Sequence, residues 1–212
     1  MSNNDNNNSI NNNSLIEDIK QFKDEYYSNK TKNVFFKNSQ KNEITKQITL
    51  KFNLKELIDK FTFIIPNTPN VFIDYTIFKL FANETNYQML VEGIMNNIDI
   101  CIQRYNEYNI HFNSDSITIS ATERHYGFIE LYTNNCIIRN NNPNVLFTEK
   151  LNKFFIYNPP YIFDNIYKII KRFIHKDINK KFIVTDKKDS KDAIAKLFVE
   201  NTESNFVDEA ES

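Results

Sequence analysis

The sequence predicts an α/β domain of three layers, in which a mostly parallel sheet lies between helices. Two observations predict it. Segments with helical spacing of apolar residues alternate with short runs rich in β-branched and aromatic residues, over roughly residues 61–200. The chain also has 212 residues, 19 of them Phe and 11 Tyr, which is enough for one domain with a substantial core.

Three stretches are predicted to lie outside that domain. Residues 1–13 are rich in Asn and Ser, and this composition predicts a disordered tail. Residues 14–60 are predicted to form an N-terminal helix that begins at Ser14, followed by extended segments that include residues 43–52 and by a short helix. Residues 201–212 are predicted to be an acidic, flexible tail.

Within residues 61–200, strands and helices are predicted to alternate. The predicted strands are the apolar runs on either side of the Pro66–Pro69 turn and residues 109–120, 150–158 and 180–186. The predicted helices cover residues 84–108, 121–138, 159–174 and 190–200. The strand over 109–120 depends on the alternation of Ile117 and Ile119 with polar residues. The pair Pro159-Pro160 ends one strand and fits the first turn of the helix that follows.

Composition argues against several classes of function. The 26 basic and 27 acidic residues give a net charge of -1, which does not favour a nucleic-acid partner. Gly93 and Gly127 are the only glycines, so neither a dinucleotide-binding fingerprint, nor a Walker A loop, nor a Gly-x-Ser-x-Gly elbow can form. His111, His125 and His175 lack metal-ligand spacing, so no metal or other cofactor is expected.

No catalytic constellation can be assembled, and the chain is not expected to be an enzyme. Glu123, Arg124 and His125 are consecutive, and on a helix such residues diverge. Cys101 and Cys136 form no Cys-x-x-Cys pair, which fits a reducing compartment. The N-terminus resembles no secretory signal, and no apolar run could span a bilayer. A cytoplasmic monomer is therefore expected, with peripheral membrane association as a second location.

The stretch from Phe147 to Val184 resembles the signature region of CRAL-TRIO (Sec14-like) lipid-binding domains. The family has a Pro-Glu-Arg-Leu step, a Lys, a strand, Asn-Ala-Pro-aromatic, a long helix, and then a Lys and a strand. Here the step is residues 148–151, the Lys is Lys153, and the motif is Asn158-Pro159-Pro160-Tyr161. The likeness is specific over about residues 148–184, and Asn113 stands where the family has Asp.

The resemblance implies that the chain binds one hydrophobic lipid, a phospholipid being one candidate, and transfers or presents it at membranes. The helix over 161–174 would then be a gate over an apolar cavity between helix and sheet. The residues expected to line that cavity are Phe112, Ile117, Phe155, Tyr157, Phe163, Tyr167 and Ile170. Glu149 and Lys181 match family positions that contact a headgroup, whereas Ile178 stands where a family Thr would be.

A second hypothesis is a protein-interaction scaffold that keeps the fold but has lost the cavity. The many Phe and Tyr side chains could fill the space. The reduced N-terminal helical part and the absence of the family's C-terminal motif favour this alternative, which would replace the lipid by a protein partner.

Overall fold

The computed structural model describes residues 5–28, 37–141, 147–174 and 176–203. It divides the chain into two compact units, residues 1–53 and 54–212, and each is described by itself. The segments predicted for residues 1–4, 34–36 and 204–212 lie outside the described residues. In the part described, no helix is both long and apolar enough to cross a membrane.

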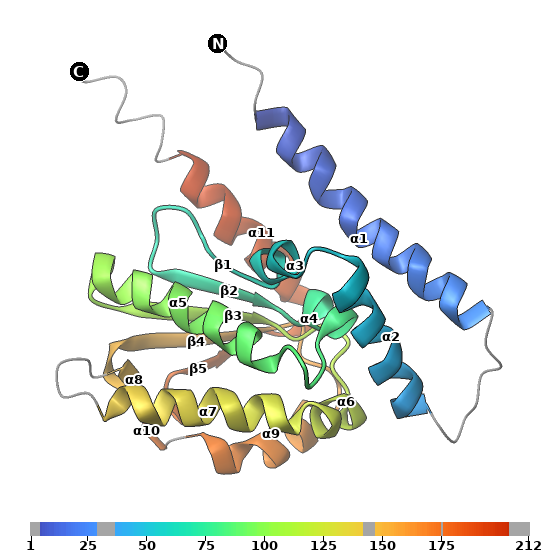
Figure 1. Cartoon of the computed structure of the whole chain (residues 1–212). Helices are drawn as coiled ribbons and strands as arrows, with labels where there is room; N and C mark the ends of the chain where they lie inside the picture. The colour runs from blue at the N-terminus through green and yellow to red at the C-terminus, as the bar shows by residue number, and fades with distance from the viewer. Residues whose placement is uncertain (1–4, 29–36, 142–146, 175, 204–212) are drawn as a thin grey trace. The chain divides into compact units, whose positions relative to one another are not determined.

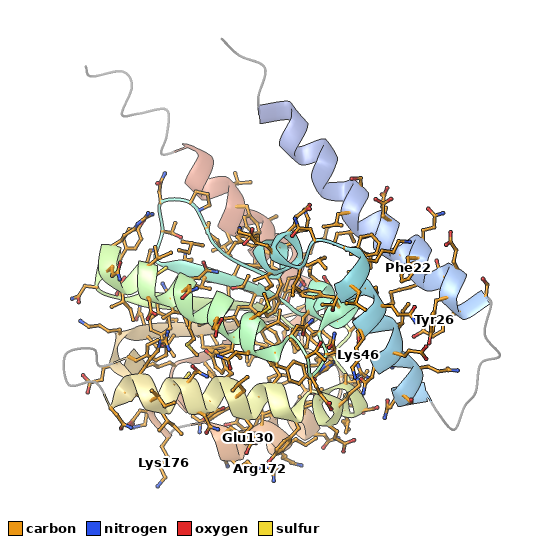
Figure 2. The ribbon with its side chains drawn as sticks, in the orientation of Figure 1. Phe22, Tyr26, Lys46, Glu130, Arg172 and Lys176 are labelled. Carbon is orange, nitrogen blue, oxygen red and sulfur yellow. The ribbon has the colours of Figure 1, made fainter. Side chains whose placement is uncertain are left out.

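The first unit contains two helices, α1 (Asp5–Ser28) and α2 (Lys37–Lys51). Residues 5–13, for which composition predicts disorder, belong to α1. The side chains of α1 and α2 interact within this unit: the Tyr26 hydroxyl donates to Glu43 Oε2 at 2.7 Å, and the Lys51 ammonium lies 4.1 Å from the centroid of the Phe22 ring. Figure 2 labels Phe22 and Tyr26 on α1.

The extended segment predicted for residues 43–52 is wrong, because most of it belongs to helix α2. Its Thr and Ile residues suggested a strand, yet Ile44 and Ile48 are four residues apart, as on one helix face. The hydroxyls of Thr45 and Thr49 donate back to main-chain oxygens three and four residues earlier. This bond is one way in which a helix accommodates threonine.

The second unit is built on a five-stranded sheet in the order β1-β2-β3-β4-β5. The strands are β1 (Thr62–Ile64), β2 (Asn70–Asp74), β3 (Tyr108–Asn113), β4 (Leu151–Tyr157) and β5 (Phe182–Val184). Strand β1 pairs with β2 in the antiparallel sense, and all other neighbours are parallel. The predicted α/β class with a mostly parallel sheet is therefore confirmed.

Helices lie on both faces of this sheet. They are α3 (Leu54–Phe61), α4 (Tyr75–Phe81), α5 (Tyr87–Tyr105), α6 (Ile119–Arg124), α7 (Tyr126–Asn140), α8 (Phe147–Lys150), α9 (Phe163–Ile170), α10 (Lys176–Asn179) and α11 (Lys187–Glu203). A 3₁₀ turn, η2 (Lys171–Phe173), continues α9. Helices α5, α7 and α9 lie on one side of the sheet and α11 crosses the other (Figure 1), where Phe198 packs on Phe63 and Phe72.

Several predicted elements differ from the structure. The apolar run after Pro69, predicted as a strand, continues from β2 into helix α4, and the helix predicted over 121–138 is divided into α6 and α7 at His125. The strand predicted over residues 109–120 ends at Asn113, and Ile119 begins α6 because the Thr118 side chain accepts from the Ala121 amide and caps the helix. The helix predicted over 159–174 is shorter, since α9 begins at Phe163 and changes to η2 after Ile170. Both prolines precede it, and the Pro160 carbonyl accepts from the Phe163 amide.

Candidate functional site: an apolar cavity between sheet and helices

The second unit encloses a cavity of about 250 Å³ that is partly open to the surface. Strands β3 and β4 form its floor, α7 forms one wall, and the segment from α9 to β5 covers it. Among the residues that the structure describes, every one that lines the cavity belongs to the second unit, and none of these is Lys, Arg, Asp or Glu. A cavity with this lining suits a ligand that is apolar over most of its length, because the lining side chains are mostly apolar.

The cavity extends along the whole of β3. Tyr108, Ile110, Phe112 and, just past the strand, Ser114 all line it. Alternate residues of a strand point to the same face, and these four span roughly 20 Å at about 3.3 Å per residue. On β4 the lining residues are Leu151, Phe154 and Ile156, which continue the same face. The cavity is therefore long for its volume.

The covering segment presents one apolar side to this floor. Residues Phe163, Ile166 and Ile170 of α9 line the cavity, and so do Phe173, Ile174, Ile178 and Phe182 further along. Ile166 is buried, whereas the other lining residues of α9 are half-buried. The covering segment also contacts α7, because the Phe173 ring packs edge-on against the Tyr126 ring, with ring centroids 5.0 Å apart.

The turn before α9 is fixed by hydrogen bonds. Asn158 has a positive φ of 51°, a conformation that asparagine adopts more readily than most residues. The main-chain amide of Asn158 donates to Ser190 Oγ at 2.8 Å, and its side-chain amide donates to Asn113 Oδ1 at 2.9 Å. Asn113 in turn donates to Asp74 Oδ1 at 3.2 Å. This chain of side chains anchors the start of the covering segment to the ends of β2 and β3.

The predicted lining residues divide into two groups. Phe112, Ile117, Phe163 and Ile170 line the cavity. Phe155 and Tyr157 lie on the opposite face of the sheet, where both rings stack with the His111 ring. Tyr167 is also outside the lining, since its hydroxyl donates to Asn179 Oδ1 at 3.1 Å and its ring meets Phe163 and Phe182.

The two predicted headgroup residues lie outside the cavity lining. Glu149 is exposed on α8. The Lys181 ammonium donates to the main-chain oxygens of Thr148 at 3.1 Å and Glu149 at 3.3 Å, and also to that of Leu151. Lys181 therefore joins the start of β5 to the corner between α8 and β4, and its three donors are already engaged.

The sequence interpretation missed most of the wall. Phe128, Ile129 and Tyr132 of α7 line the cavity, as do Tyr75 and Phe78 of α4. Apolar spacing on a helix cannot distinguish residues that line a cavity from residues packed in a core, and no described residue of α7 is fully buried. Burial raises the pKa of the Cys136 thiol to about 12, so this lining residue is a neutral, unreactive group at pH 7.

In the part of the chain that the structure describes, no group of three or more His, Cys, Asp or Glu side chains could hold a metal ion. His111 and His125 each have a ring nitrogen next to a tyrosine hydroxyl. His125 lines the cavity, with its Nδ1 2.8 Å from the Tyr87 hydroxyl. His111 lies on the far face of the sheet, with its Nδ1 2.9 Å from the Tyr157 hydroxyl.

Comparisons with known proteins found a family match and a similar solved structure. Residues 141–205 match the model of the CRAL/TRIO domain family. Among solved structures, the chain is similar to the crystal structure of Sfh5, with a TM-score of 0.47 and 15% identity over 69% of this chain and 56% of that chain. The chain thus spans little more than half the length of that structure. No curated protein matches the sequence.

The matched residues include β4, the Pro159-Pro160 turn, the covering segment and β5, which are the elements that carried the resemblance in the sequence. The predicted resemblance to the CRAL-TRIO family is therefore confirmed over residues 141–205.

Proposed function

We propose that this protein binds one hydrophobic lipid in the cavity of its second unit. The observation that carries the proposal is the lining, which is apolar along the full length of β3 and contains no charged side chain. An alkyl chain gains about 0.8 kcal/mol for each methylene that it buries, so even part of a long chain would supply substantial affinity.

The size of the cavity supports binding of a lipid that places one acyl chain inside it. Ligand sites for drug-sized molecules usually measure about 300–1,000 Å³, and this cavity is smaller, at about 250 Å³. A long, narrow space suits one extended chain better than two side by side. The cavity supports this proposal over the alternative, a protein-interaction scaffold whose aromatic residues fill this space.

The covering segment supports the proposal that lipid is taken up or delivered at membranes. Residues 161–181 contain six Lys or Arg and two Asp, a net charge of +4 in a chain whose net charge is -1. Lys168, Lys171, Arg172 and Lys176 are exposed, and Figure 2 labels Arg172 and Lys176 at the outer edge of the unit. Each basic residue near an anionic surface contributes about 1 kcal/mol of attraction.

Tyr161 fits the same interpretation. It follows the two prolines, and its side chain is fully exposed beside the cavity cover. Tyrosine favours the boundary between headgroups and acyl chains, because its ring is apolar and its hydroxyl is polar. A brief contact with an anionic membrane would therefore bring the cavity next to the lipid that it accepts.

The test is native mass spectrometry of the full chain purified from cells, followed by extraction of the bound lipid. Wild type should carry one lipid molecule. Ile170→Asp places a charge on the cavity lining and should abolish this binding, while Ile138→Asp, the same change at an exposed position on α7, should retain it. Circular dichroism checks that both variants fold. A wild-type chain that is empty and takes no lipid from vesicles would overturn the proposal.

A further inference from the structure

One end of the cavity carries a buried hydroxyl. Tyr75 follows β2 directly, and the register that pairs Asp74 with Asn113 places it beside Ser114 at the carboxyl ends of the strands. Tyr75 is 6% exposed and lines the cavity. Its hydroxyl makes no hydrogen bond to any residue that the structure describes. Because buried tyrosine hydroxyls usually have a partner, this oxygen marks a place for a polar group of the ligand.

A positive charge lies behind the same end of the cavity. Arg124 ends α6, and its Nη2 is 3.3 Å from Nε2 of His125, which lines the cavity. A guanidinium can only donate, so Nε2 accepts this bond, and Nδ1 of His125 then donates to the Tyr87 hydroxyl. These two contacts hold the guanidinium against the back of the cavity wall.

The guanidinium has a donor to spare. Among the described residues, Nη1 of Arg124 is buried and has no hydrogen-bond partner. A buried charged donor without a partner is costly, and an anion nearby would offset that cost. Burial raises the pKa of the Tyr75 hydroxyl and the charge of Arg124 lowers it, so the two groups interact. The charge of Glu84 acts on Tyr87 and is not among the influences on Tyr75.

We propose that the ligand is a single-chain carboxylic acid whose carboxylate accepts a hydrogen bond from Tyr75 and is neutralised by the charge of Arg124. Arg124 is not among the lining residues, so Tyr75 makes the direct contact and Arg124 acts through its field. The chain then runs along β3 from Ser114 to Tyr108. This inference rests on the proposed function, since it names the class of lipid that the same cavity takes.

The test offers delipidated full-length protein an equal mixture of palmitic acid, hexadecanol and methyl palmitate in neutral vesicles, and native mass spectrometry measures which one is bound. We expect the acid to occupy the protein at least tenfold more often than the alcohol. Tyr75→Phe should reduce this preference about tenfold, because it removes a hydrogen bond to a charged group. Arg124→Gln should remove most of it, and Arg124→Lys, which keeps the charge, should retain most of it.

Tyr105→Phe is the matched control. Tyr105 is exposed at the end of α5 and is not among the residues that line the cavity, so loss of its hydroxyl should leave the preference for the acid unchanged. Equal binding of the three ligands, unaffected by Arg124→Gln, would overturn the carboxylate inference and leave the lipid-binding proposal standing. Failure to bind any of the three would count against both.

Discussion

The guanidinium of Arg172 lies over the ring of Tyr126, with Cζ 4.7 Å from the ring centroid. This contact joins η2 of the covering segment to the first residue of α7, across one side of the cavity. Arg172 also lies 5.2 Å from the ring of Phe173, which lines the cavity. Release of a lipid past this side would require the contact to open.

We expect Arg172→Ala to speed release of a bound lipid. An exposed cation–π contact contributes about 0.5–1 kcal/mol, which corresponds to roughly a two- to fivefold faster rate if the contact is broken in the transition state. Stopped-flow transfer of a fluorescent fatty acid to neutral vesicles measures it. Lys171→Ala is the control, since it removes the same charge from the same turn. Equal acceleration in the two variants would show that charge, and not the ring contact, sets the rate.

The two glycines should respond in opposite directions to alanine. A Cβ at Gly93 of α5 would lie 2.7 Å from Cγ2 of Ile58 on α3, so either the Ile58 side chain or one of the two helices must shift. Such overpacking costs about 1–3 kcal/mol, which exceeds the gain in helix propensity of about 0.5–1 kcal/mol. A Cβ at Gly127 of α7 would meet only Cε2 of Tyr87, at 3.8 Å.

We therefore expect Gly93→Ala to lower the free energy of unfolding by about 1 kcal/mol and Gly127→Ala to raise it by up to about 1 kcal/mol. Urea denaturation of the full chain measures both. If Gly93→Ala proves as stable as Gly127→Ala, α3 and α5 can separate at no cost, and the close approach of Ile58 to Gly93 does not limit stability.

Lys181, which the family resemblance predicts to contact a headgroup, is expected to stabilise the fold instead. Its ammonium donates to three main-chain oxygens around the corner between α8 and β4. Hydrogen bonds that involve a charged group contribute about 1.5–3 kcal/mol. Since Lys181 is partly exposed, we expect Lys181→Met to lower the free energy of unfolding by about 1–2 kcal/mol. Lys180→Met, at an exposed neighbour, should have little effect.

Urea denaturation again gives the stability, and vesicle co-sedimentation gives the affinity for anionic lipid. Unchanged stability of Lys181→Met together with lost binding to phosphoinositide vesicles would contradict the structural role and restore the headgroup role. Because Lys180→Met removes the same charge, it separates specific headgroup binding from general attraction to the membrane.

The main elements of the sheet could be predicted from the sequence because their signals are local. The aromatic and β-branched run of β4, the prolines that end it and the apolar spacing of α5 each need only a few neighbouring residues. For α2 the Thr and Ile residues were misleading, and for Ile119 the alternation of apolar and polar residues was misleading. Threonine hydroxyls that bond back to the helix, and Thr118 as an N-cap, made helix the better structure.

The side of β4 that faces the cavity could not be predicted, because Phe154, Phe155, Ile156 and Tyr157 are all apolar. A strand covered on both faces lacks the alternation that would identify its inner face. The pairing of Phe154 with Ile110, and of Ile156 with Phe112, settles it. The position of Tyr75 in the cavity lining could not be predicted for a different reason, since Tyr75 begins α4, which lies next to β3 only in the folded chain.

His111 makes the stability of the fold depend on pH. It is 3% exposed, and burial lowers the pKa of its imidazole from 6.5 to about 4. Nδ1 lies 2.9 Å from the Tyr157 hydroxyl, and Nε2 has no partner among the described residues. Below about pH 6.5 the unfolded chain takes up a proton that the folded chain excludes until about pH 4.

Stability that is fully present above pH 6.5 should therefore be lost as the pH falls toward 4, by about 3 kcal/mol in all at roughly 1.4 kcal/mol per pKa unit. Urea denaturation measures the free energy of unfolding at pH 7 and at pH 5. Between these two pH values, wild type should lose up to about 2 kcal/mol more than His111→Phe, because Phe cannot take up a proton. All other ionisable groups, His125 and His175 included, are the same in both proteins, so the difference isolates His111. Equal losses would mean that the folded chain accepts the proton at His111, and that its burial against Phe155 and Tyr157 does not exclude the charge.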